Sequence, residues 1–261
     1  MNILIGNTGL VGTTLKKSTS FDLEFNSSNI HEYKDKVPDG CNVYLACLPG
    51  TKWLVNKNVK KDLANIHSIF STISTKKYNN IFLISTIDVY CQSPLKSNEE
   101  TIPTVQTLSY GTNRYLFERM VDELLDYKEL LIFRLPALFS KDFKKNALFD
   151  LLNNNNVDKV NINSVYQWYN LDFLYGDILY EREHKNPLQK KFNLFSQGVR
   201  TKRIVEELFP EHLSKVQKDV FAVNYDFCTE LDESGYLYTE EESFQQIKEF
   251  VNEYRTKPTS L

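Results

Sequence analysis

The stretch ILIGNTGLVG, residues 3–12, places three of the chain's nine glycines at Gly6, Gly9 and Gly12. Glycine loses more backbone entropy on ordering than any other residue, so this spacing indicates a turn whose main chain needs space that side chains would fill. A strand that leads into such a turn and then a helix can hold a phosphate with backbone N–H groups and the positive end of the helix. Gly6 would allow the tight turn, Gly9 the approach of a pyrophosphate, and Gly12 the packing of the helix. The stretch predicts dinucleotide binding, with a glycine turn in an unrelated α/β protein as the alternative.

Short apolar runs alternate with helical patterns through the first half of the chain. NVYLAC at 42–47 and IFLIST at 81–86 are continuous runs typical of strands buried on both faces. Strands that alternate with helices predict a doubly wound parallel sheet, in which ligands bind beyond the carboxyl ends of the strands. The expected strands are 2–6, 22–25, 42–47, 81–86 and 130–135, and the expected helices are 9–17, 57–74 and 110–125.

The second half is less regular and shows neither an internal repeat nor a Gly/Ser linker. Asparagine favours turns, so NNNN at 153–156 predicts a loop. We therefore expect residues 1–145 to form the nucleotide-binding domain and residues 146–261 to form a small α/β capping region packed on it. Whether the second region also contributes a strand to the main sheet is left open. The elements expected in this region are strands at 165–169 and 191–195 and helices at 200–209 and 240–254.

The bulk composition excludes several classes of partner. A net charge of −3 and a pI near 5.9 give no electrostatic reason to expect nucleic acid or an anionic membrane. No apolar run approaches the length of a membrane span, and no signal peptide precedes the first expected strand, so we expect a cytoplasmic protein. The cysteines lack metal-ligand spacing with the histidines, which predicts free thiols and no metal site at Cys41, Cys47, Cys91 and Cys228.

Three further stretches follow the glycine turn in a recognisable order. FLISTIDVY at 82–90 ends an apolar strand in Ser-Thr before a Val-Tyr pair, SYGTNR at 109–114 carries Tyr and a cation four residues apart, and FRLPALF at 133–139 closes the series. With ILIGNTGLVG they resemble the extended branch of the short-chain dehydrogenase/reductase superfamily, which includes nucleotide-sugar epimerases, dehydratases and 4-reductases. The resemblance implies a Rossmann-like fold and covers roughly residues 2–139.

The resemblance also implies catalytic roles for three residues. Tyr110 would be the general acid/base and Thr86, favoured over Ser85 by its spacing, would hold the reacting oxygen. Arg114 stands four residues after Tyr110, on the same helix face, where the family has lysine. A cation there can lower the pKa of a phenol, but a planar guanidinium does not replace an ammonium and cannot relay a proton.

The cofactor implied is NADP or NAD. The region FNSSN at 25–29 lacks the carboxylate that holds the NAD ribose, with Glu24 one or two residues early, which favours NADP. On the helix expected at 57–74, Asp62 and Asn65 are expected to be exposed. The expected cofactor contacts are Gly6, Asn7, Thr8, Gly9, Leu10, Val11, Gly12, Ser27, Ser28, Ala46, Cys47, Tyr110, Arg114 and Pro136.

Substrate contacts are harder to derive. SVYQWYNLDFL at 164–174 concentrates aromatic and amide groups that would suit a sugar, with an aromatic strand packed in the cap as an equal alternative. Arg200 could meet a substrate phosphate or belong to a solvated helix face. The candidate substrate contacts are Asp88, Gln167, Trp168, Tyr169 and Arg200.

Together these features predict an NAD(P)-dependent oxidoreductase acting on a nucleotide-linked or related sugar. Dehydratases of the family carry an acidic pair after the catalytic Ser/Thr motif, whereas Asp88 has no acid beside it, which favours a reductase or an epimerase. Arg114 and the short second half motivate an alternative, a catalytically inactive NAD(P)-binding sensor or assembly subunit. Whether the protein forms a homodimer is left open.

Overall fold

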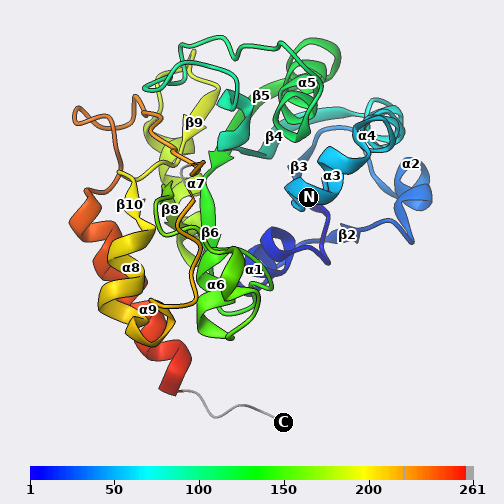
Figure 1. The fold of residues 1–261 in the computed structure, drawn as a ribbon. Helices are drawn as coiled ribbons and strands as arrows, with labels where there is room; N and C mark the ends of the chain where they lie inside the picture. The colour runs from blue at the N-terminus through cyan, green and yellow to red at the C-terminus, as the bar shows by residue number, and fades with distance from the viewer. Residues whose placement is uncertain (220, 257–261) are drawn as a thin grey trace. The chain divides into compact units, whose positions relative to one another are not determined.

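A six-stranded parallel sheet organises the first part of the computed structural model, which describes residues 1–219 and 221–256 (Figure 1). The strand order is β2-β1-β3-β4-β5-β9, and every neighbouring pair is parallel. This confirms the doubly wound α/β fold expected from the alternation of strands and helices. The strands are β1 (Asn2–Ile5), β2 (Leu23–Phe25), β3 (Cys41–Leu45), β4 (Lys77–Thr86), β5 (Asp126–Leu135) and β9 (Lys191–Asn193).

Helices cover both faces of this sheet. On one face α4 and α5 pack against each other, α2 contacts α4, and α3 contacts both α4 and α5. On the other face Arg182 of α7 lies over the Phe82 ring at 5.9 Å, and α1 contacts α7. The helices are α1 (Leu10–Ser18), α2 (Tyr33–Lys36), α3 (Lys52–Lys57), α4 (Val59–Ile73), α5 (Tyr110–Leu124) and α7 (Leu174–His184).

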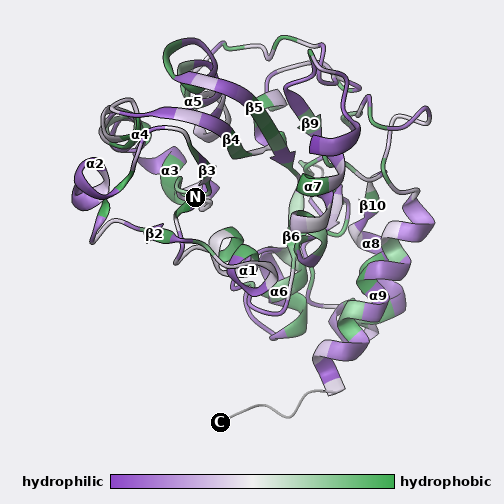
Figure 2. Ribbon diagram, turned by 180° about the vertical axis from the view of Figure 1, so that it is seen from behind, coloured by the Kyte–Doolittle hydropathy of each residue, from purple (hydrophilic) through white to green (hydrophobic). Residues whose placement is uncertain are grey.

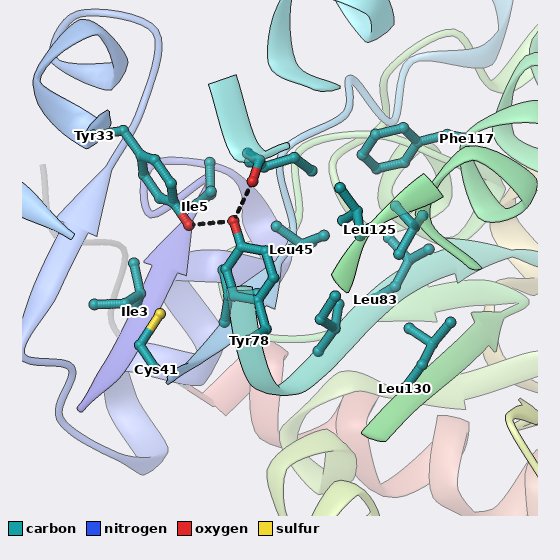
Figure 3. Packing of buried hydrophobic residues seen from close by; sticks show 14 of the residues in the cluster. Ile3, Ile5, Tyr33, Cys41, Leu45, Tyr78, Leu83, Phe117, Leu125 and Leu130 are labelled. Carbon is teal, nitrogen blue, oxygen red and sulfur yellow. Dashed lines mark hydrogen bonds between the residues drawn. The ribbon is translucent and has the colours of Figure 1, made fainter. Parts of the chain in front are cut away.

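The main hydrophobic core lies between the sheet and the α2, α4 and α5 helices (Figure 3). Side chains alternate across a strand, so Ile3 and Ile5 of β1 enter this core while Leu4 faces the opposite side. Two phenols are satisfied inside it, because the Tyr33 and Tyr78 hydroxyls lie 2.8 Å apart and Tyr78 donates to the Ile73 carbonyl at 2.6 Å. Both buried hydroxyls therefore have hydrogen-bond partners, as buried polar groups require.

In its described residues, the second unit contains two short sheets and three α-helices. Strands β6 (Ala137–Phe139) and β8 (Trp168–Asn170) pair in parallel, and β7 (Val165–Tyr166) pairs antiparallel with β10 (Val199–Arg200). Hydrophilic and hydrophobic residues alternate along the last helix in Figure 2, as an amphipathic helix requires. The helices are α6 (Ala147–Leu152), α8 (Thr201–Leu208) and α9 (Glu240–Thr256). The 3₁₀ turns of both units, within the described residues, are η1 (Ile30–Glu32), η2 (Ile87–Tyr90), η3 (Val157–Lys159), η4 (Leu171–Phe173) and η5 (Pro210–His212).

The chain divides into these two units differently from the expected boundary after residue 145. The first unit comprises Met1–Leu135 and Asp172–Asn193, and the second comprises Pro136–Leu171 and the described residues from Leu194 on. Helix α7 and strand β9 thus belong to the first unit, where β9 pairs with β5 at the sheet edge. Among the described residues, no helix combines the length and apolar composition needed to cross a membrane.

Candidate active site

The glycine turn follows β1 directly. Close contacts with main-chain atoms of the protein explain why two of its three positions are glycine. Gly6 has a φ of +97°, and a Cβ there would lie 2.1 Å from the Ala46 carbonyl oxygen. A Cβ at Gly12 would lie 2.1 Å from the Gly6 oxygen. Both positions therefore require glycine for the turn and for helix packing.

Gly9 is different, because the protein's own atoms do not demand a glycine there. Its backbone is extended (φ −77°, ψ 166°), and an added Cβ would approach no atom closer than 3.5 Å, an ordinary contact with the Gly6 oxygen. Thr8 and Gly9 are both exposed. A glycine here leaves the main chain open to a bound group, as a phosphate-binding turn requires.

Helix α1 begins at Leu10 in a state suited to an anion. Gly9 is its N-cap residue and provides no side-chain cap, and the first turn contains no acidic residue. The first N–H groups of a helix have no partner within the helix, and the helix dipole makes this end positive. The amides of Leu10, Val11 and Gly12 belong to this first turn.

The end of β2 approaches the same turn through polar contacts. Asn7 donates to Glu24 Oε2 at 2.9 Å, and Lys16 pairs with the same oxygen at 2.6 Å. Burial alone would raise the pKa of Glu24, but these two contacts bring it below its usual range. Ser28 donates its backbone N–H and its hydroxyl to Asn26, while Ser27 is exposed.

Ala46 and Cys47 follow β3 and pack against the Gly6 turn. The Ala46 N–H donates to the Ile5 carbonyl at 2.9 Å, continuing the ladder between the two strands. Burial raises the pKa of the Cys47 thiol to about 12, so it is a neutral thiol at physiological pH. Cys41, Cys47 and Cys91 are free thiols.

Strand β4 ends at Thr86, and the two hydroxyls at this end have different partners. Ser85 donates to the Glu118 carboxylate. Thr86 accepts a hydrogen bond from the Asp88 N–H at 3.2 Å and also hydrogen-bonds the Tyr110 side chain. The structure therefore places Thr86, and not Ser85, next to the Tyr110 side chain.

Helix α5 places Tyr110 by a tight contact at its first turn. Ser109 and Thr112 form a capping box, and the Tyr110 N–H donates to Asn56 Oδ1 at 2.8 Å. A Cβ at Gly111 would lie 1.8 Å from the Asp88 carbonyl oxygen, so only glycine lets the helix start approach η2 this closely. The approach brings the tyrosine beside the end of β4.

The Tyr110 phenol is buried against Arg114. The residue is 8% exposed, and Arg114 Cζ lies 4.5 Å from its ring centroid. Burial raises the pKa of Tyr110 above its usual value, Arg114 opposes the rise, and Asp88 adds to it. Hydrogen bonds with Thr86 and Arg114 lower the pKa by smaller amounts, so the phenol stays protonated at neutral pH.

Arg114 is held by the buried carboxylate of Asp62, a residue expected from the sequence to be exposed. Its Nη1 and Nη2 donate to the two oxygens of Asp62 at 2.8 and 3.1 Å, and Nη2 also donates to the Pro49 carbonyl at 2.7 Å. Asn113 donates to the same carboxylate at 2.8 Å. The expectation that Asp62 is exposed is wrong, whereas Asn65 is exposed as expected.

A recognisable signal for Asp62 exists in the helix pattern. Asp62 precedes Ile66 by four residues and Ile73 by three turns, and these three are the buried residues of α4. Positions four apart share a helix face, so the apolar stripe of α4 already includes this carboxylate. A charge on an apolar stripe indicates a buried partner.

Asp88 lies close enough to influence Tyr110 and has a cation of its own. Lys52 Nζ lies 2.6 Å from Asp88 Oδ1, with the aspartate side chain 10% and the lysine 45% exposed. The first unit thus brings together the catalytic candidates Thr86, Tyr110 and Arg114 with Asp88 and, as an unexpected member, Asp62.

The remaining predicted contacts belong to the second unit. Gln167 is fully buried and its amide donates to the Ser196 and Phe227 carbonyls and accepts from the Phe227 N–H. Trp168 and Tyr169 are also buried, at 2% and 1% exposure. These contacts favour the packing interpretation of the stretch over sugar binding. Pro136, directly after β5, is buried, and Arg200 is exposed at the start of α8.

Comparison with known proteins gives a likeness of structure only. No protein-family profile matches the chain, and no curated protein matches it by sequence. Among solved structures, MoeE5 in complex with UDP-glucose and NAD matches with a TM-score of 0.70 at 13% identity, over 97% of this chain and 99% of that one. A dTDP-4-dehydrorhamnose reductase from Yersinia enterocolitica gives the same values.

A third structure extends the likeness to an epimerase. The UDP-glucuronic acid 4-epimerase from Bacillus cereus, in complex with a fluorinated UDP-sugar and NAD, matches with a TM-score of 0.67 at 14% identity, over 96% of this chain and all of that one. Such likeness over nearly whole chains confirms the Rossmann-like fold that the sequence motifs imply. At this identity it concerns the fold, and function has to be argued from the site.

Proposed function

We propose that this protein is an NAD(P)-dependent oxidoreductase of the short-chain dehydrogenase/reductase type, a reductase or epimerase of a nucleotide-linked or related sugar. The observation that carries the proposal is the buried contact of Tyr110 with Thr86 and Arg114 beside the carboxyl end of β4. The glycine turn opens from β1 at the same edge of the parallel sheet. Ligands of such sheets bind at this edge.

The turn and the start of α1 fit a dinucleotide pyrophosphate. Gly9 is exposed and has no structural need to be glycine, and the first-turn amides of Leu10, Val11 and Gly12 lie beside it in an uncapped helix end. In support, MoeE5 and the Bacillus cereus epimerase share the fold and were solved with NAD and UDP-sugars. A bound nicotinamide would supply or accept the hydride.

The choice between the two dinucleotides depends on the end of β2. Glu24 carries a negative charge, but Lys16 and Asn7 already bind it, so we propose that it does not hold a ribose hydroxyl. Exposed Ser27 and the nearby Ser28 hydroxyl would then face a 2′-phosphate. We propose NADP ahead of NAD, and a tighter dissociation constant for NADH than for NADPH would overturn this preference.

The residues of the site would have different roles toward the substrate. Tyr110 would exchange a proton with the reacting sugar oxygen, and Thr86 would hold that oxygen by a hydrogen bond. Arg114 holds the phenol in place through its stacking on the ring. Acting together, these groups would place the reacting oxygen within reach of one proton donor.

A second candidate function follows from one observation. Arg114 is fully engaged by Asp62 and Pro49, which is also what a site that holds a cofactor without turnover would show. In that case the protein would be a sensor or an assembly subunit. Nucleotide binding without hydride transfer would distinguish it from an enzyme.

Turnover assays with purified protein test the proposal. We expect at least one member of a panel of nucleotide-linked 4-keto sugars to oxidise NADPH or NADH. The loss of dihydronicotinamide absorbance measures this oxidation. Tyr110→Phe serves as the control that removes one oxygen from the site. Binding of nucleotide with neither net hydride transfer to a panel member nor epimerisation of a nucleotide-linked sugar favours the sensor. Absence of nucleotide binding contradicts both functions.

A further inference from the structure

Two ion pairs each contribute one charged group that acts on the Tyr110 phenol, Arg114 from one pair and Asp88 from the other. Arg114 of α5 is paired with Asp62 of α4, and Lys52 of α3 is paired with Asp88 of η2. Both side chains of the first pair are 4% exposed. Arg114 and Asp88 thus act on the phenol with opposite signs, and each of them has an ion-pair partner of its own.

The Arg114–Asp62 pair is the more rigid of the two. A carboxylate that accepts two parallel N–H bonds fixes the plane of a guanidinium. The Pro49 carbonyl and the Tyr110 ring occupy two further sides of the group. Arginine stays protonated in proteins, so this group can neither give nor take a proton.

We propose that Asp62 is a positioning residue that fixes and neutralises the Arg114 guanidinium, so that Tyr110 acts from its protonated form as a proton donor. This rests on the proposed function and deepens it, because a proton-donating phenol suits a substrate with a carbonyl group. The site is thereby assigned to the reduction of a keto sugar.

Atoms balance in such a step. A hydride from the dihydronicotinamide adds to the carbonyl carbon, and the C=O π electrons take the phenolic proton from Tyr110. The sugar becomes an alcohol, the cofactor is oxidised, and the phenolate recovers a proton from solvent.

A titration of Tyr110 without nucleotide tests the role of Asp62. Protein with ¹³C-labelled tyrosine is titrated by NMR from about pH 8 to about pH 11, with Tyr110→Phe used to assign the signal. The variants are Asp62→Asn, Arg114→Gln and the double variant Asp62→Asn/Arg114→Gln, and circular dichroism checks that each is folded. The double variant replaces the ion pair by a pair of neutral amides.

We expect Asp62→Asn to lower the Tyr110 pKa by about one unit or more, which is a tenfold larger phenolate fraction at the same pH. Arg114→Gln should raise the pKa, and the double variant should return it to within about half a unit of wild type. A folded Asp62→Asn protein that titrates like wild type overturns the proposal.

The double variant keeps the test decisive if Asp62→Asn does not fold. A double variant that titrates like wild type supports neutralisation, and one shifted by about a unit or more contradicts it. Failure of the proposed function is seen separately, as absence of nicotinamide binding to wild type. The titration does not depend on that result.

Discussion

At the scale of single residues, the three glycines of the turn have different physical reasons. Gly6 and Gly12 are required by main-chain contacts within the protein, whereas Gly9 has extended backbone and room for a side chain. A substitution at Gly6 or Gly12 therefore acts on folding. A substitution at Gly9 acts on whatever approaches the turn.

Alanine substitutions separate these reasons. Gly6→Ala should lower the free energy of unfolding by about 2 kcal/mol or more, because its φ is positive and the new Cβ meets the Ala46 carbonyl. Gly9→Ala should change it by less than about 0.5 kcal/mol. Urea unfolding followed by circular dichroism measures both, and equal losses would contradict the assignment.

Tyr110 should be separable into a structural and a chemical role. Tyr110→Phe keeps the ring that stacks on Arg114 and removes the hydroxyl that meets Thr86. We expect unchanged NADPH affinity and a fall in kcat of about a hundredfold or more, because general acid catalysis usually accelerates a reaction by at least this factor. An unimpaired kcat would remove the phenol from the reaction.

At the scale of elements, a buried polar network joins α5 to the sheet. Glu118 of α5 accepts two hydrogen bonds from Arg134 of β5, at 3.1 and 2.6 Å, and one from Ser85 of β4. Arg134 also donates to the Tyr90 hydroxyl in η2. The same helix and strand carry Tyr110 and Thr86, so this network fixes the elements that form the site.

Breaking the network from one side should be costly. Glu118→Ala leaves the Arg134 guanidinium buried without its carboxylate, and we expect a loss of about 3–5 kcal/mol in the free energy of unfolding. Arg119 and Glu123 form an exposed pair on the same helix and provide the matched control. Glu123→Ala should cost less than about 1 kcal/mol, and similar losses from both substitutions would contradict the role of burial.

The sequence predicted elements where a continuous apolar run decides the structure, and it missed features that depend on partners. Strands β4 and β5 begin several residues before their apolar runs, because polar residues such as Asn80 and Glu129 are paired across the ladder. The strand expected at 165–169 is interrupted at Gln167, whose amide binds main chain from distant segments. Asp62 was missed because its partner Arg114 is 52 residues away.

At the scale of the whole molecule, the two units draw on interleaved parts of the chain, so the C-terminal half cannot be separated as one module. The first unit needs residues 172–193 for its sixth strand and for the α7 helix. Within α7, Glu181 is half-buried, and burial together with Asp177 raises its pKa to about 7.

The raised pKa of Glu181 gives stability a pH dependence of known sign. The folded carboxyl keeps a proton that the unfolded chain, with a pKa near 4.5, releases. This contribution is present below pH 4.5 and is lost as the pH rises to about 7. Glu181→Gln should therefore raise the urea midpoint at about pH 8 more than at about pH 5, and an equal change at both would contradict the shift.

If the glycine turn holds a nicotinamide dinucleotide beside Tyr110, a fluorescence titration will show it. NADPH and NADH fluorescence is measured as wild-type protein and Gly9→Val are added, because valine fits the extended backbone of Gly9 but fills the space that a pyrophosphate would need. We predict saturable binding to wild type and a loss of binding to a folded Gly9→Val protein. Equal affinity of the two proteins, or no saturable binding to wild type, would contradict dinucleotide binding at the turn.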